Sequence, residues 1–143
     1  MKKVVKFGGS SLASAEQFMK VSGIIKADDE RRFVIPSAPG KRNKKDTKVT
    51  DMLYGCYDAA SKGEDITEKI NAIKARYYEI IKGLGLSLSL EEEFKKIDED
   101  FRAQAGIQYA ASRGEFLNGK IMAAYLGYDF VDAASVIRFD KAG

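Results

Sequence analysis

The first 36 residues alternate strand-like and helix-like apolar patterns, and this order constrains the fold more than any other feature of the chain. Residues 4–7 read as a short apolar strand. Ser14 and Gln17 then form a capping box, and helical spacing of apolar residues continues from there to about Asp28. A second apolar run at residues 33–35 ends at Pro36. Strand, helix and strand in this order predict a parallel pair joined by a right-handed crossover. We expect both strands to be buried, as the strands of parallel sheets usually are.

Each predicted strand runs into a glycine-containing segment. Gly8-Gly9-Ser10-Ser11 follows the first strand, and Ser37-Ala38-Pro39-Gly40 follows the second. Parallel sheets bind their ligands beyond the carboxyl ends of the strands. The sequence therefore predicts that these two segments are neighbours at a ligand-binding edge.

The first segment has the composition of a phosphate site. Gly8 and Gly9 permit backbone conformations and a close approach that a side chain would block, so N–H groups can face an anion. Ser10 adds a hydroxyl group, and Lys6 adds a positive charge beside the turn. An ordinary strand-to-helix turn with a solvated lysine remains the alternative, because short glycine motifs have low specificity.

Three stretches of the chain, taken together, resemble the aspartate kinases of the amino-acid kinase superfamily. The first is KFGGSS, starting at Lys6. The second is Ser37 to Lys41 followed by Val49-Thr50-Asp51, with a longer basic loop between them, and the third is Ser112-Arg113-Gly114-Glu115. The three occur in the order found in that family and cover most of the chain.

This resemblance implies an α/β fold, namely a three-layer α/β/α sandwich with a mainly parallel sheet, amino-acid kinase-like but incomplete. It implies that residues 1–143 are the N-terminal portion of a catalytic domain, without the C-terminal nucleotide-binding half and the regulatory ACT domains of the family. The implied reaction is ATP-dependent phosphorylation of the side-chain carboxylate of L-aspartate to 4-phospho-L-aspartate, with Mg²⁺ accompanying ATP. The reaction is the first step toward lysine, threonine and methionine. We expect the fragment to lack appreciable turnover and the full-length protein to be a homo-oligomer.

The resemblance also assigns roles to residues. For the nucleotide, Lys6 would neutralise charge on the transferred phosphoryl group, while donors to the β- and γ-phosphates would come from Gly8, Gly9 and Ser10. For the acceptor, the candidates are Ser37, Thr50, Arg113 and Glu115.

Three of the acceptor candidates have simpler structural explanations. Glu115 follows Ser112 by three residues, which is the spacing of a capping box at a helix start. Thr50 precedes an apolar helical stripe and could be a helix N-cap. Arg113 could pair with an acceptor carboxylate or lie exposed in solvent.

Composition excludes several other classes of function. The chain has no histidine and a single cysteine, so a histidine-based metal site, a Cys-His or Ser-His catalytic pair and an internal disulfide are all excluded. Cys56 falls on an apolar helical stripe and is expected to be a buried thiol. No apolar run is long enough to span a membrane, and we expect a cytoplasmic protein. Basic residues gather in residues 41–48, but without aromatic residues for base stacking they favour a solvated rim over nucleic-acid binding.

The rest of the chain is predicted to be mainly helical. Helices are expected at residues 49–61 and 65–82, the second closed by Gly83 and with Ile73 and Tyr77 packing in its apolar stripe. A Ser89 and Glu92 capping box would open another helix, with Phe94, Phe101 and Ala105 among its inward-facing residues. A last helix would run from Ser112 to Gly127, followed by a strand at residues 128–131 and a further extended piece near residues 136–139.

Two other functions stay open. Another member of the superfamily would act on glutamate, acetylglutamate or a nucleotide monophosphate. A non-catalytic module would bind an amino acid or an anion without phosphoryl transfer, since a fold alone does not determine activity.

Overall fold

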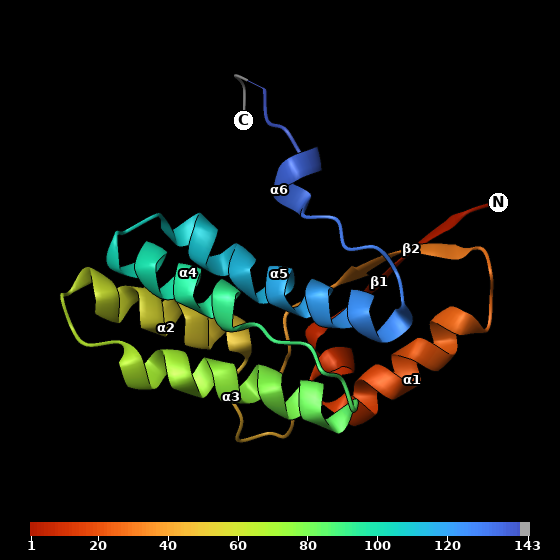
Figure 1. Ribbon diagram of the computed structural model, residues 1–143, viewed down its shortest axis with the longest axis horizontal. Helices are drawn as coiled ribbons and strands as arrows, with labels where there is room; N and C mark the ends of the chain where they lie inside the picture. The colour runs from red at the N-terminus through yellow and green to blue at the C-terminus, as the bar shows by residue number, and fades with distance from the viewer. Residues whose placement is uncertain (141–143) are drawn as a thin grey trace.

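The computed structural model describes residues 1–140 and contains a small parallel sheet packed against a cluster of helices (Figure 1). The elements, in chain order, are β1 (Lys3–Phe7), the 3-10 helix η1 (Gly9–Leu12), α1 (Ala15–Lys26), β2 (Arg31–Pro36), α2 (Val49–Ser61), α3 (Thr67–Gly83), α4 (Glu91–Arg102), α5 (Ile107–Leu126) and α6 (Ala133–Val136).

The predicted parallel strand pair is confirmed. β1 and β2 pair in parallel, with Val4 opposite Phe33 and Lys6 opposite Ile35. The expectation that both strands are buried is wrong for one face of this sheet. Val4, Phe33 and Ile35 are 63%, 54% and 50% exposed, because the helices of residues 1–140 cover only the other face, where Val5, Phe7 and Val34 pack against the core.

Helices α2 to α5 form the main core and lie side by side in Figure 1. The apolar stripes predicted for the second and third of these helices are confirmed by the fully buried Ile73, Tyr77, Phe94 and Phe101. Cys56 is also buried, as predicted. No helix in residues 1–140 is long and apolar enough to cross a membrane.

The ends of the helices differ from the predictions in several places. Ser14 caps α1 and accepts a hydrogen bond from the Gln17 N–H, as expected. Ser89 instead accepts from the N–H of Glu91, and the N-cap of α4 is Leu90. Ala105 is exposed because α4 ends at Arg102 and the backbone then turns at Gly106, whose φ is 120°.

At the end of α3, Gly83 lies inside the helix, and the left-handed conformation belongs to Gly85, with φ 68°. The missing side chain of Gly83 has another role. A Cβ there would lie 2.5 Å from Ala15 Cβ, so the glycine lets α3 pack closely on the start of α1.

The strand predicted at residues 128–131 is wrong, and the extended piece predicted near residues 136–139 begins only at Ile137, after α6. Gly127 ends α5 in the left-handed conformation, as predicted, but residues 128–132 form no strand and α6 occupies residues 133–136. An extended segment becomes a strand only where another strand can pair with it, and no such partner lies beside residues 128–139 within the described part of the chain. α6 stands away from the helical cluster, and its residues are exposed (Figure 1).

Candidate functional site

The two glycine-containing segments at the ends of β1 and β2 are in direct contact, as the sequence predicted. The N–H of Gly40 donates a 2.8 Å hydrogen bond to the carbonyl of Gly9. A Cβ on Gly40 would lie 2.6 Å from the Gly9 carbonyl carbon and 2.8 Å from the Ser10 nitrogen. A Cβ on Gly9 would lie 2.9 Å from the Ala38 carbonyl oxygen. Both positions therefore need glycine for steric reasons.

The third motif joins the same cluster through Gly114. A Cβ on Gly114 would lie 2.7 Å from Ala38 Cβ and 3.2 Å from Leu53 Cδ1, so α5 approaches the second glycine segment closely. The Tyr77 hydroxyl donates a 2.7 Å hydrogen bond to the Gly114 carbonyl. Segments that lie far apart in the sequence thus meet around Gly9, Ala38 and Gly114.

The predicted phosphate turn is open to solvent. Gly8 and Ser10 are exposed, and Gly9 leads directly into η1. Lys6 is exposed on the outer face of the sheet and forms no ion pair within the described residues. Its ammonium group is therefore available to an anion.

Ser37 and Thr50 flank the second glycine segment. Ser37 N–H donates to the Phe7 carbonyl at 3.0 Å, while its own carbonyl accepts a 2.7 Å hydrogen bond from Asn118 Nδ2. Asn118 is fully buried, and its Oδ1 has no hydrogen-bond partner within the described residues. Thr50 lies in the first turn of α2, whose N-cap is Lys48, so the N-cap explanation of Thr50 is wrong. A hydrogen bond from the Val49 N–H to the Pro39 carbonyl, 3.1 Å long, keeps this helix start beside the glycine segment.

The capping-box explanation of Glu115 is also wrong. Ser112 and Glu115 both lie inside the continuous helix α5, and the Ser112 hydroxyl donates to the carbonyl of Tyr109 one turn earlier. Glu115 is exposed. Its carboxylate is therefore not used to cap a helix and can meet a ligand.

Arg113 is held by its own helix. Its guanidinium group lies 4.5 Å from the ring centre of Tyr109 and 4.4 Å from that of Phe116, and it donates to Ser112 Oγ. It is half-buried and not freely exposed, contrary to one of the two expectations. A contact with an acceptor carboxylate stays a prediction.

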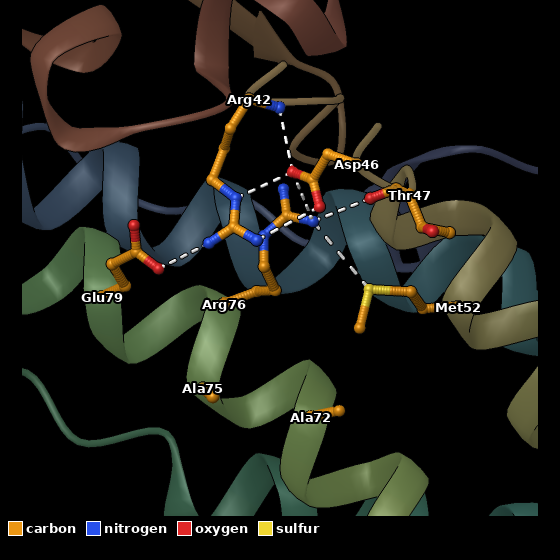
Figure 2. Close-up of a pocket in the computed structure, with 8 residues that line it drawn as sticks. All are labelled: Arg42, Asp46, Thr47, Met52, Ala72, Ala75, Arg76 and Glu79. Carbon is orange, nitrogen blue, oxygen red and sulfur yellow. Dashed lines mark hydrogen bonds and ion pairs between the residues drawn. The ribbon is translucent and has the colours of Figure 1, made fainter. Parts of the chain in front are cut away.

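A network of ion pairs closes the basic loop between Gly40 and α2, and Figure 2 shows its side chains around a pocket of about 360 Å³. The carboxylate of Asp46 accepts from the Nε of Arg42 at 2.7 Å and lies 3.4 Å from Arg76 Nη1. Arg42 also pairs with Glu79 at 2.7 Å. The pocket lies behind the loop and not at the glycine turn, and the charged residues that line it pair with one another.

Charge and burial shift the pKa values of this network. Hydrogen bonds from Arg42 hold the pKa of Asp46 well below its usual range, and the same contact raises the pKa of Arg42. Burial lowers the pKa of Arg76, as does the nearby charge of Arg42. Arginine nevertheless stays protonated near neutral pH, so Arg76 acts as a buried cation whose charge Asp46 offsets.

Sequence reasoning missed three residues that organise this site, namely Arg76, Tyr77 and Asn118, and it named Gly114 in a motif without giving it a role. Tyr77 was expected to be a packing residue, and its hydroxyl has a specific acceptor in addition. Arg76 is 5% exposed, and no sequence pattern marks an arginine for burial. The small residue at position 114 was the one available signal, because glycine inside a helix often marks a close approach.

Comparisons with known proteins agree with this arrangement. The amino acid kinase family matches residues 1–142. Aspartokinase 3 of Bacillus subtilis (strain 168) is 39% identical over 142 residues, which are 94% of this chain and 31% of that protein.

Solved structures are also similar. The crystal structure of an aspartate kinase from Clostridium acetobutylicum superimposes with a TM-score of 0.92 at 48% identity, over 98% of this chain and 32% of that one. E. coli aspartokinase III in complex with aspartate and ADP superimposes with a TM-score of 0.71 at 23% identity, over 89% of this chain and 29% of that one, and supports the fold. The chain spans about a third of the length of these relatives.

Proposed function

Because this chain belongs to the amino acid kinase family, we propose that it forms the N-terminal part of an aspartate kinase catalytic domain. The proposed reaction transfers the γ-phosphoryl group of ATP to the side-chain carboxylate of L-aspartate. The observation that carries this proposal is the contact of three separate motif segments around Gly9, Ala38 and Gly114. The similarity to Aspartokinase 3 of Bacillus subtilis and to the aspartate kinase of Clostridium acetobutylicum supports the substrate.

The phosphate end of the site would be the turn after β1. A carboxylate is a weak nucleophile, so the protein assists mainly by positioning the two reactants and by neutralising charge on the phosphoryl oxygens. Gly8, Gly9 and Ser10 would donate N–H and hydroxyl hydrogen bonds to the β- and γ-phosphates. Lys6, which no carboxylate of the described residues neutralises, would supply the positive charge.

The acceptor end would lie between the start of α2 and the middle of α5. Glu115 would bind the ammonium group of aspartate, and Ser37 and Thr50 would offer polar contacts nearby. Arg113 is held against two aromatic rings and already donates to Ser112 Oγ, so we expect it to contribute less than Glu115.

Within residues 1–140 no group of three His, Cys, Asp or Glu side chains could hold a metal ion. We expect Mg²⁺ to enter with the ATP phosphates, and none of the roles assigned above depends on a metal ligand from these residues.

The test uses the full-length protein that contains this chain. Release of ADP should require L-aspartate and should not occur with L-glutamate, N-acetylglutamate or UMP. Lys6→Ala should lower kcat at least about tenfold, because one lost charge contact to a transferring phosphoryl group typically costs more than ~1.4 kcal/mol. Lys2→Ala, which removes another exposed lysine of the same strand region, should leave kcat unchanged.

Several outcomes would contradict the proposal. Equal turnover of Lys6→Ala and Lys2→Ala would remove Lys6 from the mechanism. Turnover with another acceptor would assign the protein to another member of the superfamily. Saturable aspartate binding without ADP release would favour a non-catalytic binding module. The native mass of the full-length protein would test the expected homo-oligomer.

A further inference from the structure

We propose that α3 sets the geometry of both halves of the site through two adjacent buried side chains. Arg76 would position the loop that meets the phosphate turn, and Tyr77 would position the helix segment that carries Glu115. This inference rests on the function proposed above and assigns positioning roles, since neither side chain is placed against substrate.

Arg76 ties together both ends of the loop between β2 and α2. Its Nη2 donates to the Gly40 carbonyl and its Nη1 to the Thr47 carbonyl, each at 2.7 Å. Figure 2 shows the guanidinium between Asp46, Thr47 and Met52, with α3 below it. The planar fork of an arginine can hold two carbonyls at fixed separation, which the single ammonium of a lysine cannot reproduce.

The loop passes this constraint on to the phosphate turn through Gly40. Both backbone polar groups of Gly40 are held, because its carbonyl accepts from Arg76 while its N–H donates to the Gly9 carbonyl. The absent side chains of Gly9 and Gly40 let the two backbones touch. A displacement of Gly40 would therefore move Gly9, whose N–H is proposed to bind phosphate together with donors from Gly8 and Ser10.

Tyr77 acts on the other half of the site. Its hydroxyl donates to the Gly114 carbonyl, one residue before Glu115, and the ring is fully buried. Gly114 also faces Ala38 of the second glycine segment, so this part of α5 is packed from two directions. Burial raises the pKa of the Tyr77 hydroxyl, which keeps it a hydrogen-bond donor at every working pH.

The adjacency of the two residues explains how one helix can serve both segments. Consecutive residues of an α-helix point about 100° apart, so Arg76 and Tyr77 leave α3 in different directions. Arg76 reaches the loop that precedes α2, whereas Tyr77 reaches α5. The distance between the phosphate turn and Glu115 is then set by a single rigid element.

The experiment measures KM for each substrate in variants of the full-length protein. Arg76→Lys should raise KM for ATP at least about fivefold and leave KM for aspartate within about twofold. Tyr77→Phe should raise KM for aspartate at least about fivefold and leave KM for ATP within about twofold. Two controls remove similar contacts elsewhere. Arg42→Lys disrupts the side-chain bonds to Asp46 and Glu79 in the same ion-pair network, none of which involves Gly40. Tyr78→Phe removes a hydroxyl that accepts from the Leu90 N–H. Both controls should keep both KM values.

Purely structural roles would give a different result. A variant that merely unfolds in part lowers kcat through its active fraction and leaves both KM values unchanged, and this outcome for Arg76→Lys and Tyr77→Phe would overturn the proposal. If the wild-type protein does not phosphorylate aspartate, the proposed function fails, and amide hydrogen exchange still tests the positioning of the turn. The amide hydrogens of Gly40 and Ser11 should then exchange faster in Arg76→Lys than in Arg42→Lys. Equal exchange rates in the two variants would refute the positioning role of Arg76.

Discussion

Replacing Gly40 with alanine would place a methyl group inside the contact between the two glycine segments. The new Cβ would lie 2.6 Å from the Gly9 carbonyl carbon and 2.9 Å from the Gly9 carbonyl oxygen, both backbone atoms that cannot rotate away. Ordinary contacts at this position need at least 3.4 Å, so the two segments must separate. Separation also weakens the hydrogen bond from Gly40 N–H to Gly9.

The size of the effect follows from these two losses. Overpacking against a fixed neighbour costs about 1–3 kcal/mol, and the lost hydrogen bond about 1 kcal/mol. Reduced freedom of the unfolded chain returns about 0.4–1 kcal/mol. We expect Gly40→Ala to lower the free energy of unfolding by about 1–3.5 kcal/mol, which for a chain of this length lowers Tm by about 3–12 °C.

The matched control is Gly8→Ala in the same turn. Gly8 has φ −77°, which alanine adopts readily, and no atom lies within 4 Å of its added Cβ. The free energy of unfolding of Gly8→Ala should equal that of the wild-type chain or be slightly higher. Urea unfolding of the two variants, followed by circular dichroism, makes the comparison. Equal midpoints for Gly40→Ala and Gly8→Ala would refute the tight contact on which the site depends.

Three further predictions concern other parts of the chain. In thermal melts, Gly127→Ala should lower the free energy of unfolding by about 1–2 kcal/mol, because the backbone there has a φ of 71°. Gly23→Ala, on the open face of α1, should raise it by up to about 1 kcal/mol. Asp46→Asn should lower the free energy of unfolding by about 1–3 kcal/mol at neutral pH. Since the folded pKa of Asp46 is depressed, its carboxylate stabilises the fold above the unfolded pKa of ~3.9, so in urea titrations the difference should shrink as pH falls below that value. Burial raises the pKa of Cys56 to about 11, so the folded chain should not react with a thiol reagent near neutral pH but should react once unfolded; rapid labelling would contradict the buried thiol.

The first half of the fold was predictable because its determinants are local. The determinants are the apolar spacing in residues 3–36, the Ser14 cap and Pro36 at the end of the second strand, and each acts on residues close to it in the chain. The closeness of Gly9 and Gly40 followed from the general placement of loops at the carboxyl edge of a parallel sheet.

The errors occurred where distant residues decide the structure. Ser112 and Glu115 have capping-box spacing, but the preceding residues 107–111 already continue the helix, and Gly106 is the position where the chain turns. Residues 128–131 have strand-like composition and lack a neighbouring strand in the described part of the chain. The burial of Arg76 depends on carbonyl groups that are 29 and 36 residues away, which no local pattern reveals.

The loop between Gly40 and α2 also makes the chain selectively cleavable. Lys44 and Lys45 are exposed at its turn, and loop tips of this kind are the preferred sites of proteolytic nicking. A cut there by trypsin would divide the polypeptide between its strand pair and its helical cluster. The hydrogen bonds of Ser37 with Asn118 and of Gly40 with Arg76 span the cut. The nicked protein should therefore migrate as two pieces on a denaturing gel while eluting as a single species from a sizing column.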